Sequence, residues 1–367
     1  MQLKDSSRFY TFSALNINMK KNIVALICCL ALIQLSIAQK KNVRVALVGF
    51  YNLENLFDTV HNENKNDYDF TPSGPYKYNS SIYYQKLDHL ATAISQIGLE
   101  KSPDGLAMFG VAEIEDSTVL HDLALTEKLK SRNYKFVHFE GPDVRGIDVG
   151  LFYNPKYFRV LASEPLFVLL PPNGKDAYFT RDVLYVKGIF GGDTVHVFVN
   201  HWPSRLGGEE RSKAARAAAA QVCKSKIDLI LADNPNSKIM AMGDLNDDPT
   251  SPSVVVTMKA KAKIEDVGLT DIYNPWINFY KKGIGTIAYQ DSWGLFDQIM
   301  LSGAWLDKKQ KGFYYQNATI FNADFLIQKT GKFKNYPKRT WDGITFNYGY
   351  SDHFPVYITL YKTVPAQ

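Results

Sequence analysis

The chain has 367 residues, of which 46% are hydrophobic, 13% aromatic and 22% charged. This composition supports a sizeable core and excludes a disordered chain, and the length allows one large domain or two ordinary ones. The formal net charge is +5, but residues 1–38 hold four Lys and Arg against one Asp. The remainder is therefore close to neutral and gives no global electrostatic support for a nucleic-acid partner.

Residues 1–38 have the pattern of a secretory signal peptide. Two lysines precede an apolar run over 23–35, and a small-residue cleavage site ends at Ala38. The run is short for a membrane span, so an uncleaved anchor is the less favoured alternative. We predict a signal peptide over 1–38, with Met19 as an alternative start, and a single domain over 39–367. The protein would then be exported to the periplasm or the cell exterior, with no stable membrane span after cleavage.

Cys223 is the only cysteine after residue 38. An internal disulfide is therefore excluded in the mature chain, and its core must hold it together. Cys223 lies among Ala and Val in a helical pattern, which predicts a small buried side chain rather than a reactive thiol. No Cys/His spacing suited to zinc is present.

Apolar alternation and helical periodicity predict thirteen elements along the chain. Strands are expected over 43–51, 106–112, 134–139, 148–153, 158–161, 181–190, 194–200, 239–242, 298–301 and 356–360, and helices over 83–97, 119–130 and 211–232. Hairpin-like strand pairs that alternate with helices predict an α/β sandwich, with two sheets face to face and helices outside. Loops over 61–80 and 278–292 are expected to rim a cleft.

Polar side chains follow the first two long strands. Asn52 could orient a phosphate oxygen or a metal-bound water, although an Asn that caps a turn is the alternative. Glu113 directly follows an apolar strand and offers the carboxylate that Mg²⁺ prefers. Glu115 and Asp116 are expected at the start of the next helix, where acidic residues favour the helix dipole.

Two segments in the middle of the chain carry candidate phosphate contacts. Arg145, in a glycine-rich turn, could meet a phosphate while Asp148 faces the cleft; an Arg–Asp pair that only braces the loop is the alternative. His201 follows a β-rich run and could protonate a leaving oxygen, with Asn200 and Arg205 adding phosphate contacts. A lone His more often has a structural role, but the neighbours of His201 and the other polar segments favour a catalytic role.

The strongest sequence signal is a pair of strand-end clusters about a hundred residues apart. Gly243-Asp244-Leu245-Asn246 closes one apolar run, and Ser351-Asp352-His353 precedes another. An imidazole needs a partner on its second nitrogen, and Asp297 is placed to orient His353 if their strands are adjacent. A seryl nucleophile is disfavoured because no G-x-S-x-G elbow is present.

In this order and combination, the segments resemble the endonuclease/exonuclease/phosphatase superfamily, which includes deoxyribonuclease I, AP endonucleases, secreted sphingomyelinases and inositol-polyphosphate phosphatases. The resemblance covers residues 43–362 and implies a four-layer α/β sandwich of two mixed sheets and a divalent-metal phosphoesterase. It assigns the metal to Glu113, with Asn52 and Asp352 helping. Asp244 and Asn246 would position the attacking water and the phosphate, and His353, His201 and Asp297 would complete the catalytic set.

Features of particular branches of the superfamily indicate which branches the chain resembles. The opening over 50–58 looks like bacterial exported members. AP endonucleases generally lack the histidine that corresponds to His201, and the single mature cysteine excludes the disulfide of animal secreted deoxyribonucleases. The implied cofactor is Mg²⁺, with Mn²⁺ or Ca²⁺ as alternatives, and no obligate protein partner is evident.

The favoured function at this point is hydrolysis of nucleic-acid phosphodiesters by an exported endonuclease, with in-line attack of water. Lysines and aromatics interleave over 308–339, which suits binding of a polynucleotide. A Lys-rich surface whose aromatics point into the core is an equally favoured alternative. A phosphatase or phosphodiesterase of small or lipid-derived esters is the second prediction. A non-catalytic binding protein on the same fold is the third.

Overall fold

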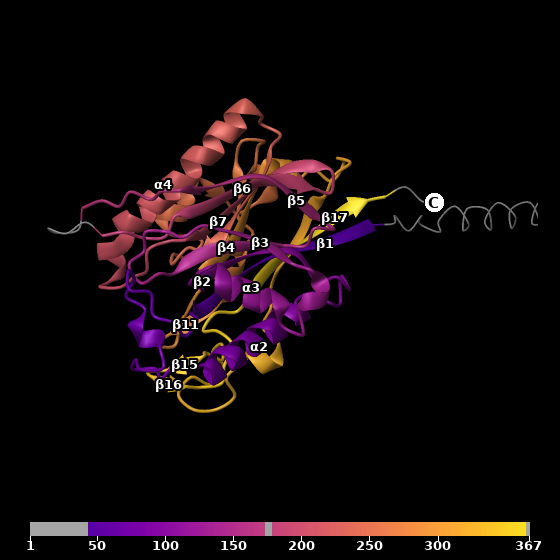
Figure 1. Cartoon of the computed structure of the whole chain (residues 1–367). Helices are drawn as coiled ribbons and strands as arrows, with labels where there is room; N and C mark the ends of the chain where they lie inside the picture. The colour runs from indigo at the N-terminus through magenta and orange to yellow at the C-terminus, as the bar shows by residue number, and fades with distance from the viewer. Residues whose placement is uncertain (1–42, 173–177, 365–367) are drawn as a thin grey trace, which may run out of the picture. The chain divides into compact units, whose positions relative to one another are not determined.

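Two mixed β-sheets form the centre of the chain (Figure 1). A computed structural model describes residues 43–172 and 178–364; the predicted signal peptide lies outside the described residues. Val43–Thr363 form one compact unit. The first sheet has the strand order β14-β17-β1-β2-β4-β3 and the second β5-β6-β7-β8-β13-β10-β9.

The bounds of the elements are as follows. The first sheet contains β1 (Val43–Leu56), β2 (Leu106–Ile114), β3 (Lys135–His138), β4 (Asp148–Tyr153), β14 (Tyr314–Ile320) and β17 (Val356–Thr363). The second contains β5 (Phe158–Leu166), β6 (Val183–Phe190), β7 (Asp193–His201), β8 (Lys238–Asp244), β9 (Ala260–Lys261), β10 (Ile272–Tyr273) and β13 (Asp297–Ser302). The α-helices are α2 (Ser80–Gln96), α3 (Ser117–Leu125), α4 (Glu209–Asp233) and α5 (Trp276–Tyr280). Two small hairpins pair β11 (Ile287–Tyr289) with β12 (Ser292–Gly294) and β15 (Trp341–Asp342) with β16 (Thr345–Phe346).

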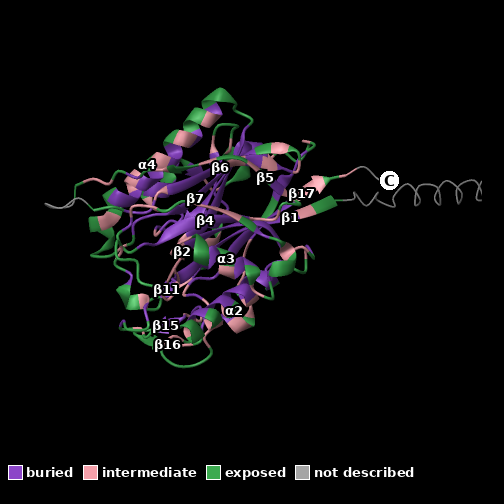
Figure 2. Ribbon diagram, viewed as in Figure 1, coloured by how far each residue is buried: buried purple, intermediate pink, exposed green. Residues whose placement is uncertain are grey.

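Three apolar clusters divide the fold into four layers, which confirms the predicted α/β sandwich. Inward side chains of both sheets, such as Val48 and Met240, form the middle cluster. The outer face of the first sheet packs on α2 and α3 through residues such as Leu90 and Leu120. The outer face of the second packs on α4, where Cys223 is fully buried as predicted. Figure 2 shows the central strands as buried and the outward face of α4 as exposed.

The same strand arrangement occurs at the centre of both sheets. β1 runs parallel to β2, and β7 runs parallel to β8. An antiparallel strand lies beside each pair, β17 next to β1 and β13 next to β8. The carboxyl ends of β1 and β2 lie beside the start of β17, and those of β7 and β8 lie beside the start of β13. A hydrogen bond between Asn52 and Asp244 brings these two sheet edges together at one end of the sandwich.

The predicted elements are present with shifted ends, and the prediction missed one long strand. β14 forms an edge of the first sheet and pairs with β17. For the segment 308–339, an exposed basic and aromatic surface and aromatics that point into the core were equally favoured, and Phe313, Tyr314 and Tyr315 are buried. Their aromatic rings belong to the core because the strand brings them onto the sheet.

Candidate active site

Irregular backbone at the ends of β1 and β2 positions the first two polar side chains. The regular pairing of β1 with β2 continues to Asn52 and Ala112 and is then interrupted by a bulge. Glu113 has φ of 59°, a left-handed value that is uncommon outside glycine. The Glu113 carboxylate consequently accepts from the Asn55 backbone N–H (2.9 Å) and the Asn52 amide Nδ2 (3.1 Å). Strained backbone held in place by several partners is typical of functional sites.

The second sheet contributes His201 and Asp244, which are directly opposite each other on the parallel strands β7 and β8. The strands approach closely at Gly243, where a Cβ would lie 2.1 Å from the Asn200 carbonyl oxygen. Only glycine fits there. Asn246 follows in the left-handed region (φ 48°), and its backbone N–H donates to Asp244 Oδ1 (2.9 Å).

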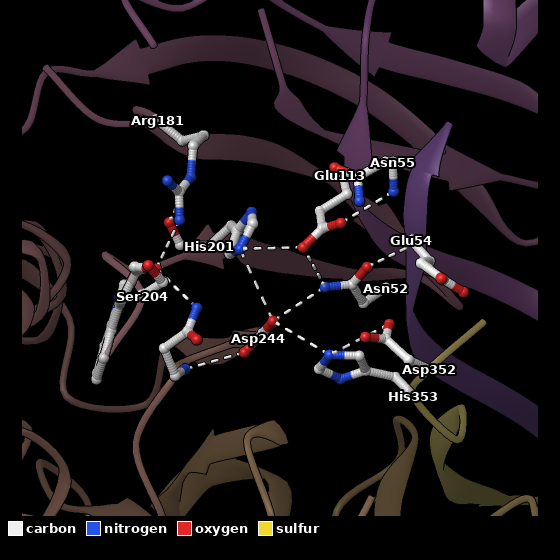
Figure 3. A network of polar contacts seen from close by, with 12 residues as sticks. Asn52, Glu54, Asn55, Glu113, Arg181, His201, Ser204, Asp244, Asp352 and His353 are labelled. Carbon is white, nitrogen blue, oxygen red and sulfur yellow. Dashed lines mark hydrogen bonds and ion pairs between the residues drawn. The ribbon is translucent and has the colours of Figure 1, made fainter. Parts of the chain in front are cut away.

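Asn52 joins the two sheets (Figure 3). Its Nδ2 donates both to Glu113 Oε1 and to Asp244 Oδ2, the latter at 3.0 Å. The Asn52 carbonyl accepts from Ser351 Oγ (2.7 Å), and the same hydroxyl accepts from the His353 backbone N–H. One asparagine thus connects the ends of β1, β2 and β8 with the loop that carries His353.

His353 and Asp297 form the predicted pair. Asp297 is opposite Asp244 in the β13–β8 register, and its Oδ2 lies 2.7 Å from His353 Nδ1. Asp297 therefore holds a proton on Nδ1, and Nε2 faces Asp244 Oδ2 at 3.8 Å. The adjacency on which the sequence prediction depended is present.

Glu113, His201 and Asp244 offer three ligand atoms within 4.8 Å of one another. His201 Nε2 lies 3.8 Å from Glu113 Oε1 and 3.7 Å from Asp244 Oδ2. Two carboxylates that converge around one amide NH2 group repel each other, and a divalent cation would relieve that repulsion. Glu113 also keeps partial solvent access. The donor set therefore fits a divalent cation.

The charged forms in the cluster are set by burial and by neighbouring charges. Burial raises the pKa of Asp244 to about 6, opposed by the charge of His353. Burial alone would lower the pKa of His353, but Asp297 and Asp244 outweigh it and hold that pKa well above its ordinary value. Burial and then the charges of Arg181 and Arg145 hold the pKa of His201 well below its ordinary value. Of the two imidazoles that face Asp244, His353 is thus favoured in its charged form and His201 in its neutral form.

Three predicted phosphate contacts occupy different positions relative to the cluster. Asn200 is fully buried, donates to the Met242 carbonyl and accepts from Trp202 Nε1. Strand alternation turns its side chain away from His201, so the predicted phosphate contact of Asn200 is corrected to a structural role. Arg145 is half-exposed and lies 3.5 Å from Asp143, and its positive charge helps to lower the pKa of His201.

Arg205 is the third of these predicted contacts, and carboxylates already surround it. It donates to Glu209 and Asp248 at 3.0 Å, and its Nε donates to the Asn246 carbonyl at 2.9 Å. Its guanidinium therefore braces the wall beside Asn246, and the side chain keeps an exposed fraction of 25%. The phosphate contact of Arg205 stays a prediction.

Two more acidic residues had expected places: Asp352 near the metal and Asp148 facing the cleft. Asp352 Oδ1 lies 3.9 Å from His353 Nε2 and its Oδ2 lies 3.9 Å from Arg339, outside the three-residue donor group. Its role as a metal ligand stays a prediction. Asp148 is buried and accepts from the Gly141 backbone N–H, so it braces the loop and does not face the cleft. Asp116 caps α3, as expected for the start of that helix.

Arg181 is a buried cation at the site that the sequence did not reveal. It donates to the Trp202 carbonyl (2.6 Å), the His201 carbonyl (3.2 Å) and Asp143 Oδ2 (3.2 Å). A second buried cation, Lys86, donates to the Glu54 carbonyl (2.6 Å). A polar residue near the start of a strand or within a helix gives no local signal, because its partners are distant in the sequence.

Comparisons with known proteins agree with this geometry. A model of the Endonuclease/Exonuclease/phosphatase family matches residues 47–362. No curated protein sequence matches the chain. Among the described residues, none of the helices has the length and apolar character needed to cross a bilayer.

Solved structures share the fold at low sequence identity. An endonuclease/exonuclease/phosphatase family protein of Bacteroides thetaiotaomicron has a TM-score of 0.53 and 16% identity, covering 88% of this chain and 100% of that chain. A mannosyl-6-phosphatase of the same organism has a TM-score of 0.50 and 18% identity, covering 86% and 99%. An endonuclease/exonuclease/phosphatase of Bacteroides vulgatus has a TM-score of 0.50 and 14% identity, covering 86% and 98%. The chain belongs to the endonuclease/exonuclease/phosphatase family and is a hydrolase of phosphoesters.

Proposed function

We propose that the chain hydrolyses small phosphate esters by direct attack of water, with a divalent cation bound at the strand-end cluster. The observation that carries the proposal is the convergence of Glu113, Asp244 and His353 around Asn52. These residues come from both sheets, so the site exists only when the two sheets are packed. No side chain in the cluster is a Ser or Cys nucleophile with an adjacent base, which favours water as the attacking group.

Glu113 and Asp244 are the residues that would hold the cation. Asn52 orients both carboxylates, and His201 and Asp352 lie close enough to one or other side of the cluster to assist. When bound, a divalent cation supplies charge neutralisation for the phosphate and the leaving alkoxide. Carboxylate oxygens favour Mg²⁺, with Mn²⁺ or Ca²⁺ as the alternatives.

The chain's own residues would move the protons. His353 holds one proton on Nδ1 against Asp297 and presents Nε2 to the substrate, where it donates to a phosphate or leaving oxygen. Asp244 Oδ2 would accept a proton from the attacking water. The Asn246 amide uses one N–H on the Trp202 carbonyl (3.0 Å) and keeps the second for a phosphate oxygen.

Small esters are proposed ahead of nucleic acid because the expected polynucleotide surface loses most of its aromatic side chains. Phe313, Tyr314, Tyr315 and Tyr336 are buried. Phe333 is the exception, with Arg339 4.9 Å from its ring centroid. Lysines that have few exposed aromatic rings beside them, on which bases could stack, give only weak, non-specific attraction to nucleic acid. The endonuclease stays the second candidate, since the cluster itself does not distinguish a monoester from a diester.

The discriminating experiment is phosphate release from a panel of small monoesters, alongside nicking of supercoiled plasmid. Each assay contains Mg²⁺, and each is repeated with EDTA and with His353→Asn. Phosphate release that both controls abolish supports the proposal. Plasmid nicking that both controls abolish would transfer the assignment to an endonuclease, and inactivity in both assays would contradict it.

We also propose that the protein is exported, on the signal-peptide pattern that ends at Ala38. The measurement is the N-terminal sequence of the protein purified from the periplasm or medium of a bacterial host. A mature chain that begins at Gln39 would support the proposal. Retention of residues 19–38 on a membrane-bound protein would contradict it.

A further inference from the structure

A cavity of about 630 Å³ lies beside the catalytic cluster. Two of its lining residues connect it to the cluster. Arg205 donates to the Asn246 carbonyl, and Phe296 directly precedes Asp297. The Phe296 carbonyl accepts from the Leu245 backbone N–H (2.9 Å), which fixes this wall against the end of β8. The volume falls within the range of roughly 300–1,000 Å³ that is usual for ligand pockets.

The β11–β12 hairpin supplies the apolar wall of this cavity. Ile287 and Tyr289 lie two residues apart and therefore on one face of β11, and both line the cavity. Ala288, between them, is buried on the opposite face. Tyr289 is 72% exposed. Its aromatic ring thus borders the cavity and is largely open to solvent.

A tight turn and an aromatic contact brace the hairpin. Gln290 and Asp291 both have positive φ values (49° and 61°), which is the two-residue turn that matches the twist of paired strands. Trp293 lies 6.1 Å from Phe354 in a stacked arrangement, next to His353 in the sequence. The hairpin is therefore packed against the residue that follows the catalytic imidazole in the sequence.

Another part of the lining is polar and carries more negative than positive charge, with Arg205 against Glu209 and Asp248. Arg205 lies 4.6 Å above the Phe296 ring, with Glu209 and Asp248 each 3.0 Å from its guanidinium nitrogens. Two carboxylates against one guanidinium disfavour a phosphodiester chain in this cavity. Carboxylates and a guanidinium do suit hydroxyl groups, which both donate and accept hydrogen bonds.

We infer that this cavity is a subsite for the sugar ring of a monosaccharide phosphate, with Tyr289 as a specificity-determining residue. The inference rests on the proposed function, because the phosphate of the same substrate must reach the cluster. A sugar ring has apolar C–H faces and a hydroxyl-bearing edge, and it carries no charge of its own. The aromatic wall matches the face, and the polar wall around Arg205 matches the edge.

The test compares wild type with Tyr289→Ala on a cyclic and an acyclic substrate, mannose 6-phosphate and glycerol 3-phosphate. Tyr289 is exposed, so the variant should fold normally, which its melting temperature checks. We expect KM for mannose 6-phosphate to rise about tenfold with little change in kcat, since the lost stacking acts on binding of a remote part of the substrate. Both parameters for glycerol 3-phosphate should stay unchanged.

Tyr84→Ala is the matched control, because Tyr84 is 62% exposed on α2 and does not line the cavity. It should leave both substrates unaffected. Equal KM values for wild type and Tyr289→Ala on mannose 6-phosphate would overturn the subsite while leaving hydrolysis of glycerol 3-phosphate intact. Loss of plasmid nicking in Tyr289→Ala would instead indicate a nucleobase in the cavity and overturn the sugar assignment. A wild-type protein inactive on every phosphate ester would show failure of the proposed function itself.

Discussion

His353 is the residue whose chemistry depends most on its neighbours. Asp297 orients its ring, and Asp297 and Asp244 together hold its pKa well above the ordinary value although the side chain is buried. His353→Asn preserves a donor to Asp297 but cannot exchange a proton. We predict that kcat falls by ~10²–10⁴-fold while the far-UV circular dichroism spectrum stays unchanged, as expected for loss of one acid–base group.

His121→Ala is the control for that measurement, because the His121 side chain is 65% exposed on α3. It should retain wild-type kcat. Retention of activity within threefold in His353→Asn would contradict the assigned role, whatever the behaviour of the control.

Arg181 acts on the site through the backbone. Its guanidinium holds the carbonyl oxygens of His201 and Trp202 and is paired with the buried Asp143. Arg181→Met would leave the Asp143 carboxylate without this buried partner. We predict a loss of about 3 kcal/mol in the free energy of unfolding, measured by urea denaturation.

Arg145→Met provides the comparison at the same carboxylate. The Arg145 side chain is 49% exposed, and its ion pair with Asp143 should contribute less than about 1 kcal/mol. Equal losses in the two variants would show that burial of Arg181 is not what makes its pairing strong.

At the scale of elements, the strand pair β6–β7 contains a pH-sensitive histidine outside the active site. Tyr185 on β6 and His196 Nδ1 on β7 are 2.7 Å apart, and both residues are buried. Burial, with Lys187 and Lys226 adding, lowers the pKa of His196 to about 4. Below its ordinary pKa of 6.5 the unfolded chain takes up a proton that the folded chain refuses, so stability falls as pH drops from 6.5 towards 4.

His196→Gln should therefore lose less stability than wild type between pH 7 and pH 4.5, as measured by urea midpoints at the two values. His121→Gln, at an exposed position, should follow the wild-type trend. An identical decline in wild type and His196→Gln would show that this histidine does not control the acid response.

The elements also show which parts of the site were predictable from sequence. Glu113, Asp244 and His353 each lie at the end or start of an apolar strand, and that local pattern was enough to single out residues that lie close together in space. Asn200 was misassigned because residue order alone does not reveal which face of a strand a side chain takes. Arg181 and Tyr289 were not singled out, since their partners come from elements far away in the sequence.

For the whole molecule, the alternation of strands and helices was enough to predict the sandwich but not its edges. β14 was missed because its polar residues interrupt the apolar pattern of a strand; pairing with β17 brings Tyr314 and Tyr315 onto the sheet, where they are buried, while Gln316 and Asn317 stay exposed. The packing of two similarly arranged sheets explains why the cluster lies at one end. Asn52 and Asp244, 192 positions apart in sequence, are joined by one hydrogen bond across the two sheets.

The cation dependence of phosphate release tests the central claim most directly. The measurement is the initial rate on the best small ester, with Mg²⁺ or EDTA, for wild type, Glu113→Gln and the control Glu100→Gln, whose side chain is 62% exposed. We predict that wild type and Glu100→Gln are active only with Mg²⁺, and that Glu113→Gln loses at least ~10²-fold in rate, consistent with several kcal/mol of charge stabilisation. Mg²⁺ should also raise the melting temperature of wild type but not that of Glu113→Gln. Full activity in EDTA, or a Glu113→Gln variant as active as wild type, would contradict a cation-dependent centre at this end of the sandwich.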